Sequence, residues 1–365
     1  MNDATGRTRY SALLHAAGTH YVDVLDQRLL PHRVQTQRIA SADDAAIAIR
    51  DMAVRGAPLI GAVGAYGLAL ALDTDTSDAA LSSAHAMLDA TRPTAVNLRW
   101  ALDRVHARVV SLAPKERAHA AWAEADAIFA EDVSINEAIG RHGLSLLRDI
   151  AREHERTVNV MTHCNAGALA TCGLGTATAP IFLAHDEGMP LHVWVSETRP
   201  RLQGANLTAW EMAQRDIAHT LIVDGASGLL MRRGDVDLVI VGADRVAANG
   251  DVCNKIGTYL KALAARDNNV PFYVAAPSPS IDFTVRDGVA EIPIEQRGPE
   301  EVSHIAGKTA DGRIETVQLT PDGSPVANYA FDVTPARLVT GLITERGVLA
   351  ASRESLAKAF PERAS

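Results

Sequence analysis

The sequence predicts an α/β protein with a small, mainly helical N-terminal domain followed by a domain built on a parallel sheet. Residues 43–112 show helical patterns separated by breaks that carry glycine or proline, with only two short strands before them. From residue 157 the pattern changes, and short apolar runs alternate with helical segments. Such alternation implies a parallel sheet with right-handed crossovers, and 365 residues are enough for two domains.

We expect the first domain to span residues 1–115. Tyr21–Leu25 alternates as a strand does, and residues 33–39 are its expected partner in a short β-hairpin. Helices are predicted at 43–54, 59–72 and 77–89, and in an amphipathic segment that ends near residue 112. The apolar stretch 57–72 is rich in glycine and too short for a membrane span, which predicts a packed helix.

The remaining chain divides into two parts. Residues 116–156 are expected to form linking helices, with a break near Asp132–Ser134. Residues 157–365 are expected to form the catalytic domain. Its predicted strands lie at 158–161, 191–195, 219–223, 237–244, 271–276 and 329–333, and its predicted helices at 207–215, 228–232, 253–266 and 335–345.

Composition narrows the class of function. The formal net charge of −9 argues against a nucleic-acid binder held by phosphate contacts. The three cysteines form no C-x-x-C pair and no zinc-spaced cluster with histidine, so we expect no metal site and a reduced, cytoplasmic compartment. No signal-peptide pattern opens the chain, and no membrane partner is expected.

Polar side chains follow several predicted strands. Cys164 follows the strand at 158–161, beside His163, and Asp244 ends the strand at 237–244. Ligands of open α/β sheets bind outside the carboxyl ends of the strands, so these side chains could converge. The glycines and threonines of 173–178 suit a phosphorylated small molecule. Alternatively, Cys164 is a small buried hydrophobe, and Asp244 hydrogen-bonds a loop.

Positive side chains lie at breaks between predicted helices. Arg55 precedes Gly56 and Ala57 at the start of one helix, and Arg92 lies in the break before another. Free N–H groups at a helix start attract anions, although solvated arginines at a helix corner would give the same pattern. Asn254 and Lys255 are expected at a helix start and also suit a phosphate. His32 and residues 295–301 are interpreted as surface features.

Six motifs in this order resemble the methylthioribose-1-phosphate isomerase family of methionine salvage. They are R-G-A-P at 55–58, R-P-T-A-V-N at 92–97, T-H-C-N-A-G at 162–167, E-T-R-P at 197–200 with Q-G-A-N-L-T at 203–208, G-A-D-R-V at 242–246 and N-K-I-G-T at 254–258. Together with D-Q-R-L-L-P at 26–31 and D-V-T-P at 332–335, they cover nearly the whole chain. The wider superfamily also contains regulatory subunits of a translation-initiation exchange factor.

The resemblance implies a helical N-terminal domain, a Rossmann-like C-terminal domain and a homodimer. It implies that Cys164 and Asp244 are catalytic. It further implies that the sugar phosphate is bound, without a cofactor, by Arg55, Gly56, Ala57, Arg92, Gln203, Asn254 and Lys255. An isomerase of 5-deoxyribose 1-phosphate or ribose 1,5-bisphosphate, and a non-catalytic regulatory subunit, are the alternatives. The route of hydrogen transfer, through a Cys164 thiolate or as a hydride, also stays open.

Overall fold

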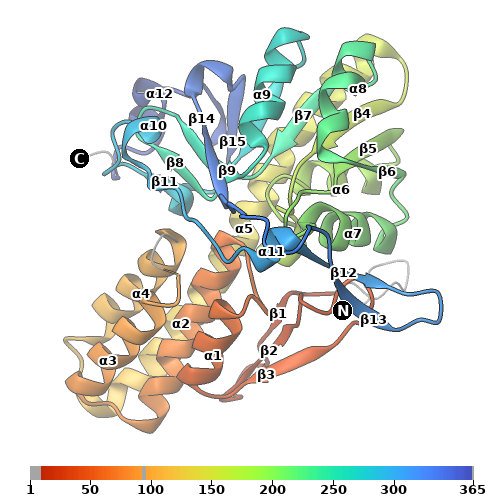
Figure 1. Ribbon diagram of the computed structural model, residues 1–365. Helices are drawn as coiled ribbons and strands as arrows, with labels where there is room; N and C mark the ends of the chain where they lie inside the picture. Colours follow the sequence, from red (N-terminus) through yellow and green to blue (C-terminus); the bar gives the residue numbers. More distant parts are fainter. Residues whose placement is uncertain (1–9, 93–95, 364–365) are drawn as a thin grey trace.

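The computed structural model describes residues 10–92 and 96–363 and has two parts joined by one long helix. In Figure 1 the N-terminal strands and helices lie below, and the large sheet with its helices lies above. Helix α5 (Pro114–His154) packs on α2 and α4 of the lower part and on α6 and β15 of the upper part. The division at residues 115 and 156 stays a proposal, with α5 as the linking segment.

The N-terminal part combines a small sheet with a helical bundle. Strands β2 (Val22–Leu25) and β3 (Thr36–Ile39) pair antiparallel, so the expected hairpin forms, and β1 (Leu13–Leu14) adds a third strand. The helices are α1 (Ala42–Arg50), α2 (Ala57–Thr74), α3 (Asp78–Asp89) and α4 (Val96–Val109). Helix α2 is long and apolar enough to cross a membrane, but 78% of it is buried inside the protein, as expected for a core helix.

The break predicted in α5 near Asp132–Ser134 is wrong, because the polar residues there are bonded within the fold. The Asp132 carboxylate accepts the backbone N–H of Cys172 at 2.7 Å, and Asn136 Nδ2 donates to the Asp132 carbonyl at 2.5 Å. Both side chains are buried. The helix therefore continues where its local sequence suggests an end.

The upper part is organised around a seven-stranded sheet. Its order is β16-β15-β10-β7-β4-β5-β6, and every neighbouring pair is parallel except β15 with β16. The strands are β4 (Val158–Thr162), β5 (Leu191–Ser196), β6 (His219–Ile222), β7 (Leu238–Val241), β10 (Phe272–Ala275), β15 (Gly341–Thr344) and β16 (Gly347–Leu349). The accompanying helices are α6 (Ala179–Asp186), α7 (Ala209–Gln214), α8 (Ser227–Arg233), α9 (Thr258–Asp267) and α12 (Arg353–Ala359). The parallel sheet predicted from the alternating pattern is therefore present.

Smaller elements lie beside this sheet. A second sheet has the order β11-β8-β9-β14. Its strands are β8 (Arg245–Ala247), β9 (Val252–Lys255), β11 (Ile281–Asp282) and β14 (Phe331–Thr334). The chain between β11 and β14 forms α10 (Gly288–Glu291), α11 (Glu300–Ser303) and the hairpin of β12 (His304–Lys308) and β13 (Ile314–Gln318).

Two predicted helices are wrong in part or entirely. The helix expected from residue 253 begins only at Thr258, because β9 pairs antiparallel with both β8 and β14 and holds residues 252–255 extended. The helix expected at 335–345 is a single 3₁₀ turn, Ala336–Leu338, followed by β15. Residues 341–344 are extended because β15 pairs with β10 and is fully buried there. The local sequence gives no sign of this pairing.

The strand order places a topological switch point between β4 and β7. From β4 the chain continues outward through β5 to β6, then returns to β7 on the other side of β4 and continues to β10 and β15. Sheets of this kind bind ligands outside the carboxyl ends of the strands that flank such a point. Cys164 follows β4 and Asp244 follows β7, so both lie at this place in the fold.

Candidate active site

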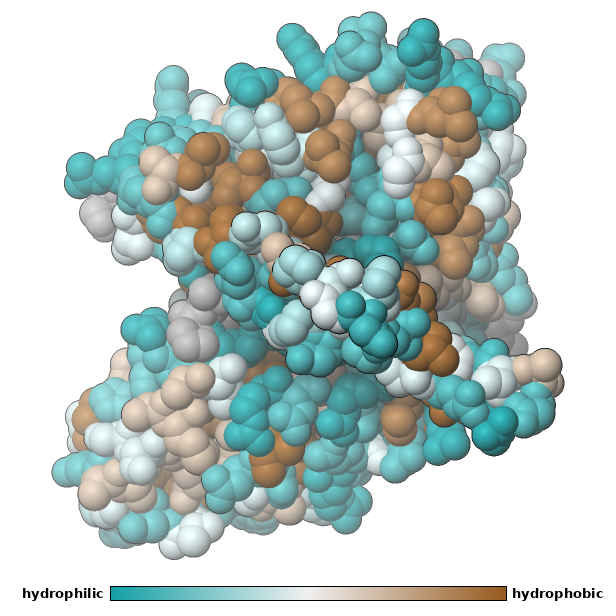
Figure 2. Space-filling view, in the orientation of Figure 1, coloured by the Kyte–Doolittle hydropathy of each residue, from teal (hydrophilic) through white to brown (hydrophobic). Residues whose placement is uncertain are grey.

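One cavity of about 650 Å³ at the switch point is lined by all nine site residues expected from the sequence. They come from the start of α2, the loop after α3, the ends of β4 and β7, the loop after β5 and strand β9. Figure 2 shows a notch between the two parts of the molecule, with hydrophobic residues above it in the region of α10. The nine residues are Arg55, Gly56, Ala57, Arg92, Cys164, Gln203, Asp244, Asn254 and Lys255.

The N-terminus of α2 forms one wall of this cavity. Gly56 precedes the helix with φ +97°, and a Cβ there would lie 2.6 Å from the backbone of Ala170, so only glycine fits. Ala57 begins the helix and Pro58 lies in its first turn. The first N–H groups of a helix have no partner within it and carry partial positive charge. This wall can therefore bind an anion.

Two cations in the cavity lack the partners that buried charges usually have. Arg92 Nε is buried with no hydrogen-bond partner. Lys255 is 8% exposed, and its Nζ lies 4.5 Å from the centre of the Phe331 ring. Burial lowers the pKa of both groups, although nearby carboxylates, Glu295 for Arg92 and Asp244 for Lys255, oppose this effect. Buried charges without partners are costly, which indicates an anionic ligand.

Arg55 is used differently from Arg92. Its Nη1 and Nη2 donate to the Asn165 carbonyl at 2.7 and 2.9 Å, its Nη2 also donates to the Asn165 side chain, and its Nε donates to Gln27 at 3.2 Å. The buried Glu211 accepts from Asn165 Nδ2 and from the N–H of Leu169 at 3.0 Å. Arg55 therefore holds the loop after β4 in addition to lending positive charge to the cavity.

Cys164 is held in an unusual backbone conformation at the end of β4. Its φ is +63°, its N–H donates to Thr198 Oγ1 at 2.7 Å, and its carbonyl accepts from Thr208 Oγ1 at 2.6 Å. The thiol donates to Gln203 Oε1 at 3.2 Å. Burial raises the pKa of the Cys164 thiol although Arg55 and Lys255 oppose this effect. The protonated thiol is therefore favoured, and the thiolate required for one route of hydrogen transfer is not.

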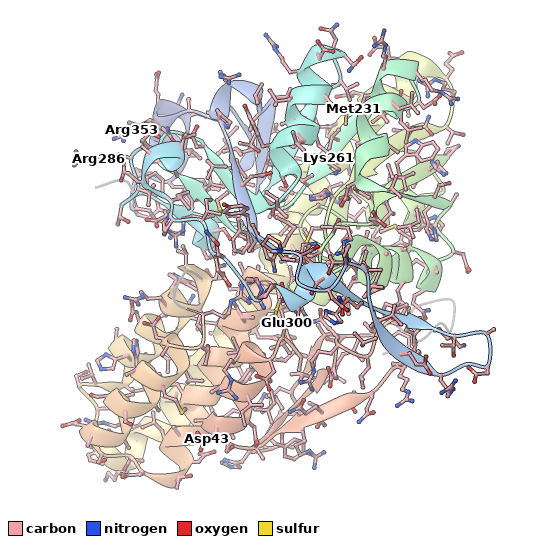
Figure 3. The ribbon with its side chains drawn as sticks, viewed as in Figure 1. Asp43, Met231, Lys261, Arg286, Glu300 and Arg353 are labelled. Atoms are coloured by element: carbon pink, nitrogen blue, oxygen red, sulfur yellow. The ribbon has the colours of Figure 1, made fainter. Side chains whose placement is uncertain are left out.

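His163 does not act on this thiol. Its Nε2 donates to the Ile256 carbonyl at 2.9 Å, so Nδ1 is the unprotonated nitrogen. Burial, together with Lys261, lowers the pKa of His163 to about 3. His163 therefore has a structural role, since it holds the Ile256 carbonyl. Lys261, labelled on α9 in Figure 3, lies 3.8 Å from the carboxylate of Asp224 behind the site.

Asp244 lies at the end of β7, and its side chain is partly buried. Its backbone N–H donates to the Cys253 carbonyl at 3.0 Å, which fixes the turn into β8. Burial raises the pKa of Asp244, while Lys255, Arg92 and Arg55 oppose the rise. A carboxyl group with a raised pKa can donate a proton near neutral pH and accept it back.

Asn254 and Lys255 lie on β9 and not at a helix start, which corrects their expected setting. Asn254 Nδ2 donates to Thr258 Oγ1 at 3.0 Å, which leaves Oδ1 available to the cavity. Gln203 is buried, and its Oε1 already accepts from Cys164, so Nε2 is the group it can offer a ligand. These residues reach the cavity through strand pairing and loop packing.

The segment 295–301 lies at the surface, as expected, and ion pairs hold it to the rest of the protein. Arg297 pairs with Glu295 and Glu301 at 3.0 Å, and Arg201 pairs with Glu301 at 2.7 Å. Although burial opposes it, hydrogen bonds from Arg297 and Arg201 lower the pKa of Glu301 to about 2. In Figure 3 the neighbouring Glu300, on α11, lies in front of the junction between the two parts. His32 is exposed, as expected.

Four residues that support the site were missed by sequence reasoning: Gln27, Thr198, Glu211 and Asp224. Asp224 accepts the N–H of Thr198 at 2.9 Å and that of Arg199 at 2.8 Å, and it thereby holds the Thr198 that binds Cys164. No local pattern marks residues whose partners lie so far along the chain. The motifs D-Q-R-L-L-P at 26–31 and E-T-R-P at 197–200 contain Gln27 and Thr198 and were the available signals. In the described residues, no group of three His, Cys, Asp or Glu could hold a metal ion, and the cysteines are free.

Comparison with known proteins adds independent information. Residues 53–351 match the model of the initiation factor 2 subunit family. Curated methylthioribose-1-phosphate isomerases of Methylocella silvestris and Sinorhizobium medicae are 61% and 60% identical, each over 94% of both chains.

Solved structures agree with these sequence matches. The structure of 5-methylthioribose 1-phosphate isomerase from Pyrococcus horikoshii has a TM-score of 0.84 and 40% identity over 98% of this chain and 97% of that one. A structure described as translation initiation factor eIF-2B subunit delta from A. fulgidus has a TM-score of 0.80 and 36% identity, over 97% and 100% of the two chains.

Proposed function

This chain belongs to the initiation factor 2 subunit family, and from that premise we propose how its residues isomerise 5-methylthioribose 1-phosphate to 5-methylthioribulose 1-phosphate in methionine salvage. The observation that carries this function is about 60% identity, over 94% of the chain, to curated methylthioribose-1-phosphate isomerases. The fold alone does not decide, because the protein described as an initiation-factor subunit shares it at 36% identity. A cytoplasmic homodimer is part of the proposal.

The reaction is an aldose–ketose isomerisation of a sugar whose anomeric oxygen carries the phosphate. The ring cannot open to a free aldehyde while that phosphate remains, so an acid must protonate the ring oxygen as its bond to C1 breaks. Asp244 is our candidate for this acid, because burial raises its pKa and favours the protonated form. The resulting carboxylate then removes the proton of the 2-hydroxyl. One group thus serves as acid and base in turn.

Hydrogen must also move from C2 to C1. We favour transfer of the C2 hydrogen as a hydride to the cationic C1, while Asp244 takes the 2-hydroxyl proton and C2 becomes the carbonyl carbon. A C2 proton transfer through Cys164 would need a thiolate, and burial raises the pKa of that thiol. Cys164 then contributes to the shape of the cavity and to the position of Gln203.

The phosphate is assigned to the positive part of the cavity. Lys255 and Arg92 supply charge, and the first N–H groups of α2, at Gly56 and Ala57, supply directed donors. Asn254 and Gln203 offer hydrogen-bonding groups for sugar hydroxyls or the phosphate. Arg55 takes part through its charge and through its hold on Asn165.

The test is turnover of 5-methylthioribose 1-phosphate by the purified protein, followed by ³¹P and ¹³C NMR of the product. We expect the ketose 1-phosphate to accumulate, and we expect Asp244→Asn to abolish turnover while the protein remains folded. Comparison of kcat/KM with 5-deoxyribose 1-phosphate and ribose 1,5-bisphosphate then identifies the preferred sugar. No ketose from folded protein would favour a regulatory subunit.

A further inference from the structure

Two loops at the carboxyl edge of the sheet bring Cys164 and Gln203 into the cavity. Cys164 follows β4, and Gln203 lies in the loop after β5. The thiol donates to Gln203 Oε1 at 3.2 Å, so the two loops meet in the wall of the cavity. The proposed function uses both side chains, one to shape the cavity and the other to offer an amide to the substrate. The geometry of the site therefore depends on what holds these two loops.

Each loop contains a residue in the left-handed region of backbone conformation. Cys164 and Thr198 both have φ +63°, although neither is glycine and threonine is branched at Cβ. Such residues persist only where the surrounding structure holds them, and they cluster at functional sites. One hydrogen bond joins the two, because the Cys164 N–H donates to Thr198 Oγ1 at 2.7 Å. This bond ties the loop after β4 to the loop after β5 at their strained positions.

Asp224 anchors Thr198 from a third element, the 3₁₀ turn that leads from β6 into α8. Asp224 Oδ1 accepts the N–H of Thr198 at 2.9 Å, and Oδ2 accepts the N–H of Arg199 at 2.8 Å. Ser196 Oγ also donates to Oδ1. Bonds to a charged acceptor are stronger than bonds to a neutral one. Asp224 does not line the cavity, so it reaches the site through Thr198.

Lys261 keeps this carboxylate charged although it lies inside the protein. Its Nζ is 3.8 Å from Asp224 Oδ1, and the lysine is 2% exposed. Burial lowers the pKa of Lys261 to about 8, while Asp224 opposes this effect, so the ammonium form predominates at neutral pH. Although burial opposes it, the Ser196 hydroxyl and Lys261 lower the pKa of Asp224. The anchor is therefore an ionised carboxylate with a buried cation behind it.

We propose that Asp224 and Thr198 are positioning residues for the isomerisation, because they hold Cys164 and Gln203 in the geometry that turnover needs. The proposal rests on the proposed function and deepens it. The charged groups assigned to the phosphate lie on other elements, namely β9, the start of α2 and the loop after α3. Loss of the bonds through Thr198 should therefore lower kcat more than it raises KM. A displacement of about 1 Å near the reacting groups is enough for a loss of about 100-fold in rate.

The experiment measures kcat and KM for 5-methylthioribose 1-phosphate in variants of these residues. Thr198→Val removes the hydroxyl that binds the Cys164 N–H, and Thr198→Ser keeps a hydroxyl. Asp224→Asn removes the charged acceptor. The matched control is Asp237→Asn at the opposite end of β7, where the carboxylate accepts the Asn159 N–H at 2.7 Å and the side chain is 4% exposed. Differential scanning calorimetry of each variant separates lost stability from lost turnover.

We expect Thr198→Val and Asp224→Asn to lower kcat about 10- to 100-fold while KM stays within about threefold. Thr198→Ser should keep kcat within about threefold of the wild-type value, because the bond to Cys164 can still form. Asp237→Asn should lower Tm and leave kcat unchanged. Since Asp224 acts through Thr198, the double variant should lose no more than the larger single loss.

Two results would overturn these roles. One is a folded Thr198→Val variant with the kcat of the wild-type protein, and the other is a double variant in which the two single losses multiply. If Asp224→Asn does not fold, the comparison of Thr198→Val with Thr198→Ser decides alone. A wild-type protein that does not turn over 5-methylthioribose 1-phosphate would instead refute the proposed function itself.

Discussion

Arg55 and Arg92 line the same cavity, but their replacement should have different consequences. Replacement of Arg92 should weaken substrate binding, whereas replacement of Arg55 should weaken the fold. Arg92 Nε is buried and has no hydrogen-bond partner among the described residues, so we expect Arg92→Ala to remove a charge that the substrate phosphate uses. A charge-assisted hydrogen bond contributes about 1.5–3 kcal/mol, so we expect the dissociation constant for substrate to rise about 10- to 100-fold. Because Arg92 Nε donates no hydrogen bond within the described residues, we expect the melting temperature of Arg92→Ala to stay within about 2 °C of the wild-type value.

Arg55→Ala should instead weaken the fold. It removes the donors to the Asn165 carbonyl and to Gln27, and it leaves the buried carboxylate of Glu211 with only one of its two nearby cations, Arg215. Loss of one partner from a buried charged network costs about 3–5 kcal/mol. For a domain of this size that corresponds to a fall of roughly 5–15 °C in Tm.

Both effects are measurable on the same samples. Isothermal titration with product gives the dissociation constants, and differential scanning calorimetry gives Tm. We expect kcat of Arg55→Ala to fall as well, since the loop that carries Cys164 loses its anchor. Equal changes in Kd and equal changes in Tm for the two variants would contradict this division of roles.

Four further predictions follow from the site and the fold. Because Asp244 must begin protonated and burial raises its pKa, kcat/KM should fall as pH rises through that pKa, and Asp244→Asn should abolish turnover. Cys164→Ser should retain activity within about tenfold, and turnover in D₂O should place no deuterium at C1; appreciable label would exclude a pure hydride shift. Burial raises the pKa of Asp132 to about 6, so the folded protein loses stability as pH rises from about 4 through 6. Asp132→Asn should remove this slope and raise Tm at pH 8, unlike Asp43→Asn at an exposed position. Light scattering should give a dimer, and a mass near 38.8 kDa at micromolar concentration would contradict it.

The sequence predicted the strand ends well because their signal is local. Leu238–Val241 is buried throughout and shows as a continuous apolar run, and Val158–Thr162 is buried except at Asn159 and is mostly apolar. A polar residue that follows such a run lies at the carboxyl edge of a parallel sheet. Cys164 and Asp244 could be placed at one edge on this ground, and the resemblance supplied their expected roles.

The surroundings of Asn254 and Lys255 could not be predicted in this way. Their strand is defined by its pairing with β14, whose residues lie about eighty positions along the chain, and the local pattern after residue 255 is helical. Contacts of that kind exist only in the folded chain. The same limit applies to Asp132. Its hydrogen-bond partner Cys172 lies forty residues away, and this contact stabilises a continuous helix where the local sequence predicts a break.

The electrostatics of the cavity favour the hydride route over the thiolate route. Arg55 and Lys255 oppose the effect of burial on the Cys164 thiol, yet the pKa of the thiol is still raised. A bound phosphate places negative charge beside these cations and screens their effect on the sulfur. Formation of a thiolate therefore becomes less favourable once the substrate is bound, when a base would be required. We expect the same phosphate to raise the pKa of Asp244 further and to favour its acid form. Substrate binding thus strengthens the group that the hydride route needs and weakens the one that the thiolate route needs.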